Sequence, residues 1–169
     1  YRSAVRINPK RANYMFSLAV AYYETRQWDD VEKSVREVLE IQPKHANALN
    51  LLGFMFSELN RNIDEAEQLL NRALEIEPNN AAFLDSLGWI YYREGKYDLA
   101  LKKIQHAANQ LPSDAVILEH LGDVYIALEN VRKALEYWQK SNKANPKERK
   151  VIEKILKHGG SVTPTLKKM

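Results

Sequence analysis

Residues 84–95 read LDSLGWIYYREG and residues 118–129 read LEHLGDVYIALE, so the pattern Leu-x-x-Leu-Gly-x-x-Tyr returns after 34 positions. Two earlier stretches fill the same slots with related residues, namely Met15, Leu18, Ala19 and Tyr22, and then Leu49, Leu52, Gly53 and Phe56. Spacings of three and four residues place each set on one face of a helix. The small residue in each set lets a second helix approach closely. The sequence therefore predicts one helical unit that is used four times.

Prolines mark the ends of these units. They are separated by 34, 35, 34 and 34 residues, at Pro9, Pro43, Pro78, Pro112 and Pro146. Proline cannot continue a helix, and it biases the preceding residue away from helical geometry. A second apolar helical face precedes each stop from Pro43 onward, so each unit is predicted to be a helix, a short turn and a helix. The second unit is one residue longer, and we expect the extra residue in the turn between Glu58 and Asp64.

In the second helices Ala66, Ala100 and Ala134 recur at one slot, which Val31 fills in the first unit. This pattern resembles the tetratricopeptide repeat family in repeat length, in the proline and in the Leu-Gly, Tyr and Ala slots. The resemblance implies an all-α fold, a right-handed α-solenoid of tetratricopeptide helix-turn-helix hairpins. The stretches around Trp89 and Asp123, with Tyr137 and Trp138, also resemble the C-terminal repeats of larger bacterial tetratricopeptide proteins. The predicted division is 1–10 as the end of a preceding repeat, 11–45, 46–80, 81–114 and 115–146 as repeats, 147–158 as a capping helix and 159–169 as a tail.

The two ends of the chain have their own predicted roles. Residues 1–8 look like the end of a second helix without its partner, so we expect the chain to be part of a longer array. In the capping helix, Val151, Ile152, Ile155 and Leu156 form one apolar stripe, which is expected to cover the last hairpin.

Composition places the chain among ordinary globular proteins. Apolar residues make up 45% and charged residues 28%, and no apolar run approaches the ~20 residues that span a membrane. The chain has no cysteine, which excludes disulfides and cysteine-based metal sites. Residues 1–131 hold 14 basic and 19 acidic residues, a balance of −5, whereas residues 132–169 hold 11 and 3, a balance of +8. The basic surplus therefore belongs to the C-terminal end.

Motifs of catalysis and cofactor binding are absent from the sequence. It contains no GxGxxG, phosphate loop, HExxH or GxSxG. The four histidines fall in different repeats or junctions, and we interpret them as helix-surface or inter-repeat residues: His45, His106, His120 and His158. The sequence predicts no catalytic residue, metal, cofactor or small-molecule substrate, and hence a non-enzymatic protein.

The resemblance also implies a binding surface, because in that family the first helix of each hairpin lines a concave groove. The groove residues implied here are Asn13, Phe16, Tyr23, Asn47, Asn50, Phe54, Asp85, Trp89, Tyr92, Glu119 and Asp123. Aromatic residues are enriched where partners bind, asparagine can bond a peptide backbone, and carboxylates favour a basic ligand. The expected function is a protein–protein interaction scaffold that binds a partner peptide or helix. A chaperone C-terminal tail is disfavoured, because Phe16, Val20, Leu51, Ala82 and Ser86 occupy the slots of its carboxylate clamp.

Two other functions are open at this stage. In the first alternative, the repeats act as spacers or self-assemble through the open N-terminal end, which offers the apolar faces of Tyr1, Ala4, Val5 and Tyr14. Alternatively, the basic C-terminal end contacts nucleic acid or an anionic membrane. The absence of aromatic residues from 139–169 and the polarity expected of an end-cap both disfavour a nucleic-acid contact.

Overall fold

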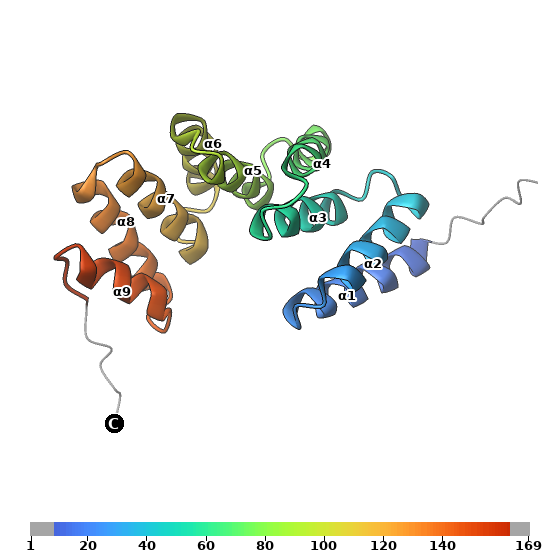
Figure 1. The fold of residues 1–169 in the computed structure, drawn as a ribbon, viewed down its shortest axis with the longest axis horizontal. Coiled ribbons are helices and arrows are strands. Elements are labelled where there is room, and N and C mark those ends of the chain that lie inside the picture. Colours follow the sequence, from blue (N-terminus) through green and yellow to red (C-terminus); the bar gives the residue numbers. More distant parts are fainter. Residues whose placement is uncertain (1–8, 163–169) are drawn as a thin grey trace, which may run out of the picture. The chain divides into compact units, whose positions relative to one another are not determined.

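The computed structural model describes residues 9–162, and every regular element in that part is a helix (Figure 1). The chain forms two compact units, residues 1–78 and 79–169. The first unit contains α1 (Pro9–Glu24), α2 (Trp28–Ile41), α3 (Ala46–Glu58) and α4 (Ile63–Ile76). The second contains α5 (Ala81–Arg93), α6 (Tyr97–Gln110), α7 (Ala115–Ala127), α8 (Val131–Ala144) and α9 (Arg149–Lys157).

Consecutive helices pair as hairpins, α1 with α2, α3 with α4, α5 with α6 and α7 with α8. The predicted small slots lie where the two helices of a hairpin meet. A Cβ atom on Gly88 would lie 2.4 Å from Cγ1 of Ile104, and one on Gly122 would lie 2.2 Å from Cδ1 of Trp138. Glycine is therefore needed at these two positions for close helix approach, whereas α1 accommodates the fully buried Ala19 in the same slot.

The proline stops have a uniform local structure. Gln42, which precedes Pro43, has φ −133° and ψ 84°, and Asn145, which precedes Pro146, has φ −131° and ψ 85°. Glu77 and Leu111 adopt nearly the same angles before their prolines. Steric exclusion of helical geometry before proline thus ends the second helix of each hairpin in the same way.

Each hairpin turn contains a residue in the left-handed region, two positions after the first helix ends. These residues are Arg26, Asn60, Gly95 and Glu129. The following N–H bonds back to a carbonyl five residues earlier, as from Lys96 to Tyr91 at 2.8 Å, which is the Schellman arrangement. The turn after α3 runs over 59–62, one residue longer than the turn over 94–96, so the predicted place of the insertion is confirmed.

The ends of the described part differ from the sequence expectations in two details. Pro9 and Lys10, assigned above to a preceding repeat, are the first residues of α1, and the predicted half-helix 1–8 lies outside the described residues. In α9 only half of the predicted apolar stripe is fully buried: Val151 and Ile155 are inaccessible, whereas Leu156 is 56% exposed. The predicted tail is described only as far as residue 162.

Within residues 9–162, no helix combines the length and apolarity needed to cross a bilayer. No cluster of potential metal ligands occurs in the same range.

Candidate functional site

Three helices of the second unit, α5, α7 and α9, position the most densely connected polar and aromatic side chains. Each helix begins with a side-chain cap. Asn80 accepts from Ala82 N–H at 3.0 Å, Asp114 from Val116 N–H at 2.9 Å, and Glu148 from Lys150 N–H at 3.3 Å. Such caps satisfy backbone donors that have no partner inside the helix. They fix where each helix starts, and hence the direction of the side chains one and two turns later.

An aromatic stack crosses from α5 to α7 and consists of Tyr92, Trp89 and His120. The ring centroids of Trp89 and Tyr92 are 4.7 Å apart with an interplanar angle of 15°, and those of Trp89 and His120 are 4.1 Å apart at 18°. Trp89 and Tyr92 are partly buried and His120 is buried. Buried His120 therefore holds one end of the stack in place, while the rings of Trp89 and Tyr92 stay partly accessible.

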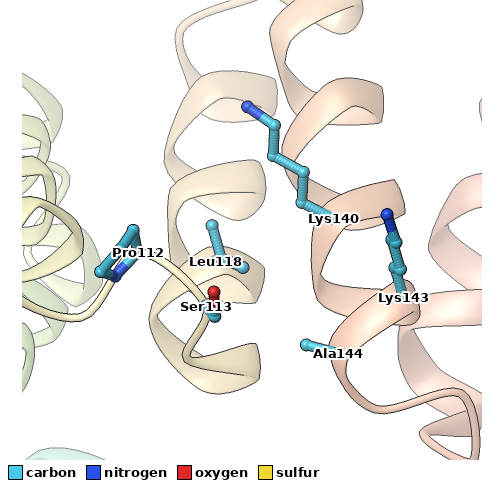
Figure 2. Close-up of a pocket in the computed structure, with 6 residues that line it drawn as sticks. All are labelled: Pro112, Ser113, Leu118, Lys140, Lys143 and Ala144. Atoms are coloured by element: carbon cyan, nitrogen blue, oxygen red, sulfur yellow. The ribbon is translucent and has the colours of Figure 1, made fainter.

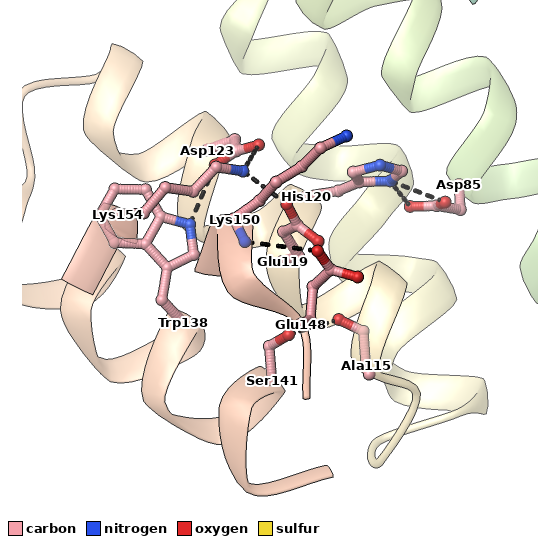
Figure 3. A network of polar contacts seen from close by, with 10 residues as sticks. All are labelled: Asp85, Ala115, Glu119, His120, Asp123, Trp138, Ser141, Glu148, Lys150 and Lys154. Carbon is pink, nitrogen blue, oxygen red and sulfur yellow. Dashed lines mark hydrogen bonds and ion pairs between the residues drawn. The ribbon is translucent and has the colours of Figure 1, made fainter. Parts of the chain in front are cut away.

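Asp85 on α5 fixes the imidazole ring of His120 through contacts with its Nδ1 atom (Figure 3). Its Nδ1 atom lies 2.9 and 3.0 Å from the two carboxylate oxygens of Asp85, which is also buried. Burial by itself lowers the pKa of the imidazole, but attraction to Asp85, with smaller contributions from Asp123 and Glu119, outweighs it and raises that pKa. The geometry and the surrounding charge both favour the protonated ring.

A second network joins α7, α8 and α9 (Figure 3). Lys154 Nζ donates to Glu119 at 2.6 Å and to Asp123 at 2.7 Å, and Trp138 Nε1 donates to the other carboxylate oxygen of Asp123 at 2.9 Å. Burial raises the pKa of Asp123, although Lys154 and Trp138 act in the opposite direction. Both carboxylates are therefore compensated within the chain.

The raised pKa of His120 predicts a pH-dependent stability. The unfolded value is near 6.5, so stabilisation by the protonated ring is fully present below about pH 6.5 and is lost as the pH rises through the raised pKa. Relative to a His120→Asn variant, the wild type should therefore lose unfolding free energy between neutral and alkaline pH. Urea unfolding followed by circular dichroism measures this difference. A difference that stays constant or grows with pH would contradict the assignment.

The second unit brings together five of the predicted groove residues. Trp89, Tyr92 and Glu119 are partly accessible, whereas Asp85 and Asp123 are buried and paired. The latter two do not present open carboxylates to a basic ligand, which differs from the sequence expectation. Their charges instead hold His120 and Lys154.

The first unit places the other six predicted residues on α1 and α3. Tyr23 donates through its hydroxyl to Glu58 at 3.1 Å, and its ring lies 5.4 Å from Trp28 and 6.4 Å from Phe54. Burial and the Glu58 carboxylate raise the pKa of this tyrosine. Phe16 contacts His45 at 4.7 Å, Asn50 is partly buried, and Asn13 and Asn47 are exposed. The structure thus forms a smaller aromatic cluster here around Tyr23.

Sequence reasoning missed three residues of the site, namely His120, Trp138 and Lys154. Two of them carry a signal in their spacing. Asp85 and His120 are 35 residues apart, as are Glu119 and Lys154, and Tyr23 and Glu58 show the same separation. One repeat plus one residue therefore links the first helix of a hairpin to the helix that follows that hairpin, and this rule finds such pairs from sequence.

A pocket of about 320 Å³ lies between the start of α7 and the end of α8, and none of its lining residues belongs to this network (Figure 2). It is lined by Pro112, Ser113, Leu118, Lys140, Lys143 and Ala144. A pocket in the first unit uses Pro43 and Leu49, which precede Pro112 and Leu118 by the same 69 positions. The space therefore recurs with the repeat and is a feature of hairpin packing.

The comparisons with known proteins agree with this architecture. The family described as "Tetratricopeptide repeat" matches residues 16–81, and a family of the same type, described as "Anaphase-promoting complex, cyclosome, subunit 3", matches residues 59–141. The chain belongs to the tetratricopeptide repeat family. Proteins of this family are in general protein–protein interaction modules and non-catalytic scaffolds. No match in sequence is found among curated proteins.

Solved structures of bacterial proteins share the fold. Pseudomonas aeruginosa PilF aligns with a TM-score of 0.78 and 22% identity, over 89% of this chain and 68% of that one. A thermophilic tetratricopeptide protein of Thermus thermophilus, TTC0263, gives 0.77 and 17%, over 92% and 84%. MamA of Desulfovibrio magneticus RS-1 gives 0.67 and 20%, over 83% and 79%. The predicted fold class, an all-α tetratricopeptide solenoid, is thereby confirmed.

Proposed function

We propose that the chain is a non-enzymatic scaffold, and that its partner binds as a peptide or helix against the face of α5 and α7. The observation that carries this proposal is the aromatic stack. Trp89 and Tyr92 remain partly accessible while buried His120 and Asp85 fix the stack from behind. Anchors at protein interfaces are typically aromatic side chains that are already held in place, because little conformational entropy is lost when the partner binds.

Electrostatics at this face favours apolar anchoring over ionic anchoring. Asp85 is paired with His120, and Lys154 is paired with both Glu119 and Asp123. Recruiting one of these groups to a ligand would break an existing buried or partly buried interaction, which is costly. The partner is therefore expected to insert apolar or aromatic side chains beside Trp89 and Tyr92.

The alternatives have less support. Lys154, part of the C-terminal basic surplus, is committed to Glu119 and Asp123, and Lys140 is paired with Glu136 at 2.6 Å. Fewer cations are thus available for phosphates than the charge count implied. Self-assembly rests on Tyr14, which is 68% exposed, and on residues outside the described range.

A peptide library tests the proposal even while the partner is unidentified. Randomised peptides displayed on phage are selected on the wild-type chain, and affinities of the selected peptides are measured by fluorescence anisotropy. Trp89→Ala should weaken their binding by about 2 kcal/mol or more, because a central aromatic anchor is lost. Circular dichroism should show that the variant keeps its helices.

The matched control is Leu99→Ala. Leu99 is 44% exposed on α6, a helix that contributes no ring to the stack, so its truncation removes accessible apolar surface but none of the three stacked rings. This variant should bind as the wild type does. Selected peptides that are insensitive to Trp89→Ala, or a selection that yields no binding peptide, would contradict the proposed function.

A further inference from the structure

We propose that His120 recognises the bound peptide directly, with its Nε2 atom donating a hydrogen bond to an amide carbonyl oxygen of the ligand. This inference rests on the proposed function, because it places the carbonyl next to the aromatic anchor on α5. His120 is not one of the groove residues implied by the family resemblance. It follows Glu119, the implied groove residue, by one position.

The geometry leaves one ring nitrogen for a ligand. Nδ1 is engaged by both oxygens of Asp85, at 2.9 and 3.0 Å. Nε2 makes no hydrogen bond to any residue in the range 9–162, and it is not among the unpartnered side-chain atoms there that are sealed from solvent. The residue as a whole is only 9% exposed. A buried side chain with one reachable and unused polar atom is therefore fixed beside the stack.

The His120 ring that carries Nε2 stacks on Trp89, the proposed aromatic anchor. The imidazole ring lies 4.1 Å from the Trp89 ring and is nearly parallel to it. A peptide side chain that packs against Trp89 and Tyr92 brings its own main chain within a few ångströms of the stack. A main-chain or side-chain amide carbonyl of the ligand can then reach Nε2–H.

The protonation chemistry decides whether Nε2 donates. Asp85 accepts from Nδ1–H, so in the neutral ring Nε2 would carry a lone pair, and only the imidazolium has a proton on both nitrogens. The charged groups facing the ring are Asp85 on α5 and Glu119 and Asp123 on α7, with Lys154 of α9 bound to the last two. Three carboxylates around two cations favour the imidazolium.

The same charge distribution selects the class of acceptor. With His120 protonated, the five groups carry a net charge of −1, so a further carboxylate, from the ligand, would meet repulsion. A neutral amide carbonyl accepts from a charged donor without that penalty. An extended peptide provides such carbonyls along its whole length.

The test uses the peptides selected on the wild-type chain, chosen for sensitivity to Trp89→Ala, and measures their affinity from about pH 6 up to the most alkaline pH at which circular dichroism shows the chain folded. Wild-type affinity should fall about tenfold or more over this range as Nε2 loses its proton. His120→Asn places an amide donor near the position of Nδ1 and can keep the bond to Asp85, but it has nothing at the position of Nε2. This variant should bind weakly at both ends of this range.

The Asp85→Asn variant tests the role of His120 through the midpoint of the pH profile of binding. A merely structural role of His120 would leave that midpoint unchanged. Loss of the carboxylate removes the main group that favours the imidazolium, so the midpoint of the pH profile should shift to lower pH. Each selected peptide should bind this variant and the wild type similarly at the acid end of the profile. Circular dichroism and a urea melt at each pH exclude unfolding as the cause.

The outcomes separate the two proposals. Peptides that need Trp89 but bind the wild type with equal affinity at all pH values overturn the role of His120 and leave the proposed function intact. Undiminished binding to His120→Asn at about pH 6, or an unchanged midpoint in Asp85→Asn, overturns it as well. A selection without Trp89-dependent peptides overturns both.

Discussion

Replacing Trp138 with alanine should lower the free energy of unfolding of the second unit by about 3–5 kcal/mol. Trp138 is 1% exposed and is the largest fully buried side chain among the described residues. Its ring fills the space above Gly122 and lies 5.2 Å from His158, and its Nε1–H donates to Asp123. Alanine would leave a cavity between α7 and α8 and remove one of the donors to a buried carboxylate. Urea unfolding followed by circular dichroism measures the loss.

Two variants separate packing from hydrogen bonding at this position. Trp138→Phe keeps most of the buried ring but loses the donor to Asp123, so it should cost about 1–3 kcal/mol. Gly122→Ala alone should also cost about 1–3 kcal/mol, because its Cβ would lie 2.2 Å from the indole. In the Trp138→Ala background the same glycine substitution should cost nearly nothing. Additive effects in this double-mutant cycle would show that the two positions are not coupled as described.

Replacing Lys154 with methionine should destabilise the second unit by about 1–3 kcal/mol. The substitution keeps an apolar stem of similar length but leaves Glu119 and Asp123 without their shared cation. Removal of one partner from a fully buried pair costs about 3–5 kcal/mol, and the 29% exposure of the Lys154 side chain reduces that figure through solvent screening. The pKa of Asp123, already raised by burial, rises further without Lys154.

The pH dependence of this loss is specific to the network. Protonation of Asp123 removes one of the two uncompensated charges, so the deficit of Lys154→Met should shrink as the pH falls toward about 4. Adding Asp123→Asn to the variant should restore part of the stability at neutral pH. The matched control is Lys157→Met, on the same helix and exposed, which should change stability by less than about 0.5 kcal/mol. Equal losses for the two lysines would refute the role of Lys154.

The hairpins could be predicted from sequence because their determinants are local. The Leu-Gly-x-x-Tyr spacing and the prolines act within one helix or one turn, and the extra residue near Asn60 could be located by comparing repeats. Gly88 and Gly122 were recognised as small slots, and the structure gives the atomic reason in Ile104 and Trp138.

The polar network could not be read from one repeat at a time. Asp85 meets His120, and Glu119 meets Lys154, only because the first helix of a hairpin and the helix after that hairpin have a fixed register. Asp85, Glu119 and Asp123 were therefore predicted to form an open acidic groove surface, whereas in the structure they pair with cations of the same unit. The burial of the apolar stripe of α9 was overestimated for a related reason. Periodicity identifies the apolar face of a helix but not which residues pack against it, and Leu156 on that face is 56% exposed.

Chemical-shift mapping tests the central claim most directly. The ¹⁵N-labelled chain is titrated with a peptide selected on it, and the indole and backbone amide signals are followed. Binding at the face of α5 and α7 predicts the largest changes at the Trp89 indole N–H and at the amides of Tyr92 and His120. Changes confined to α6 or to the pocket around Lys140 and Lys143, with the Trp89 indole unaffected, would contradict it.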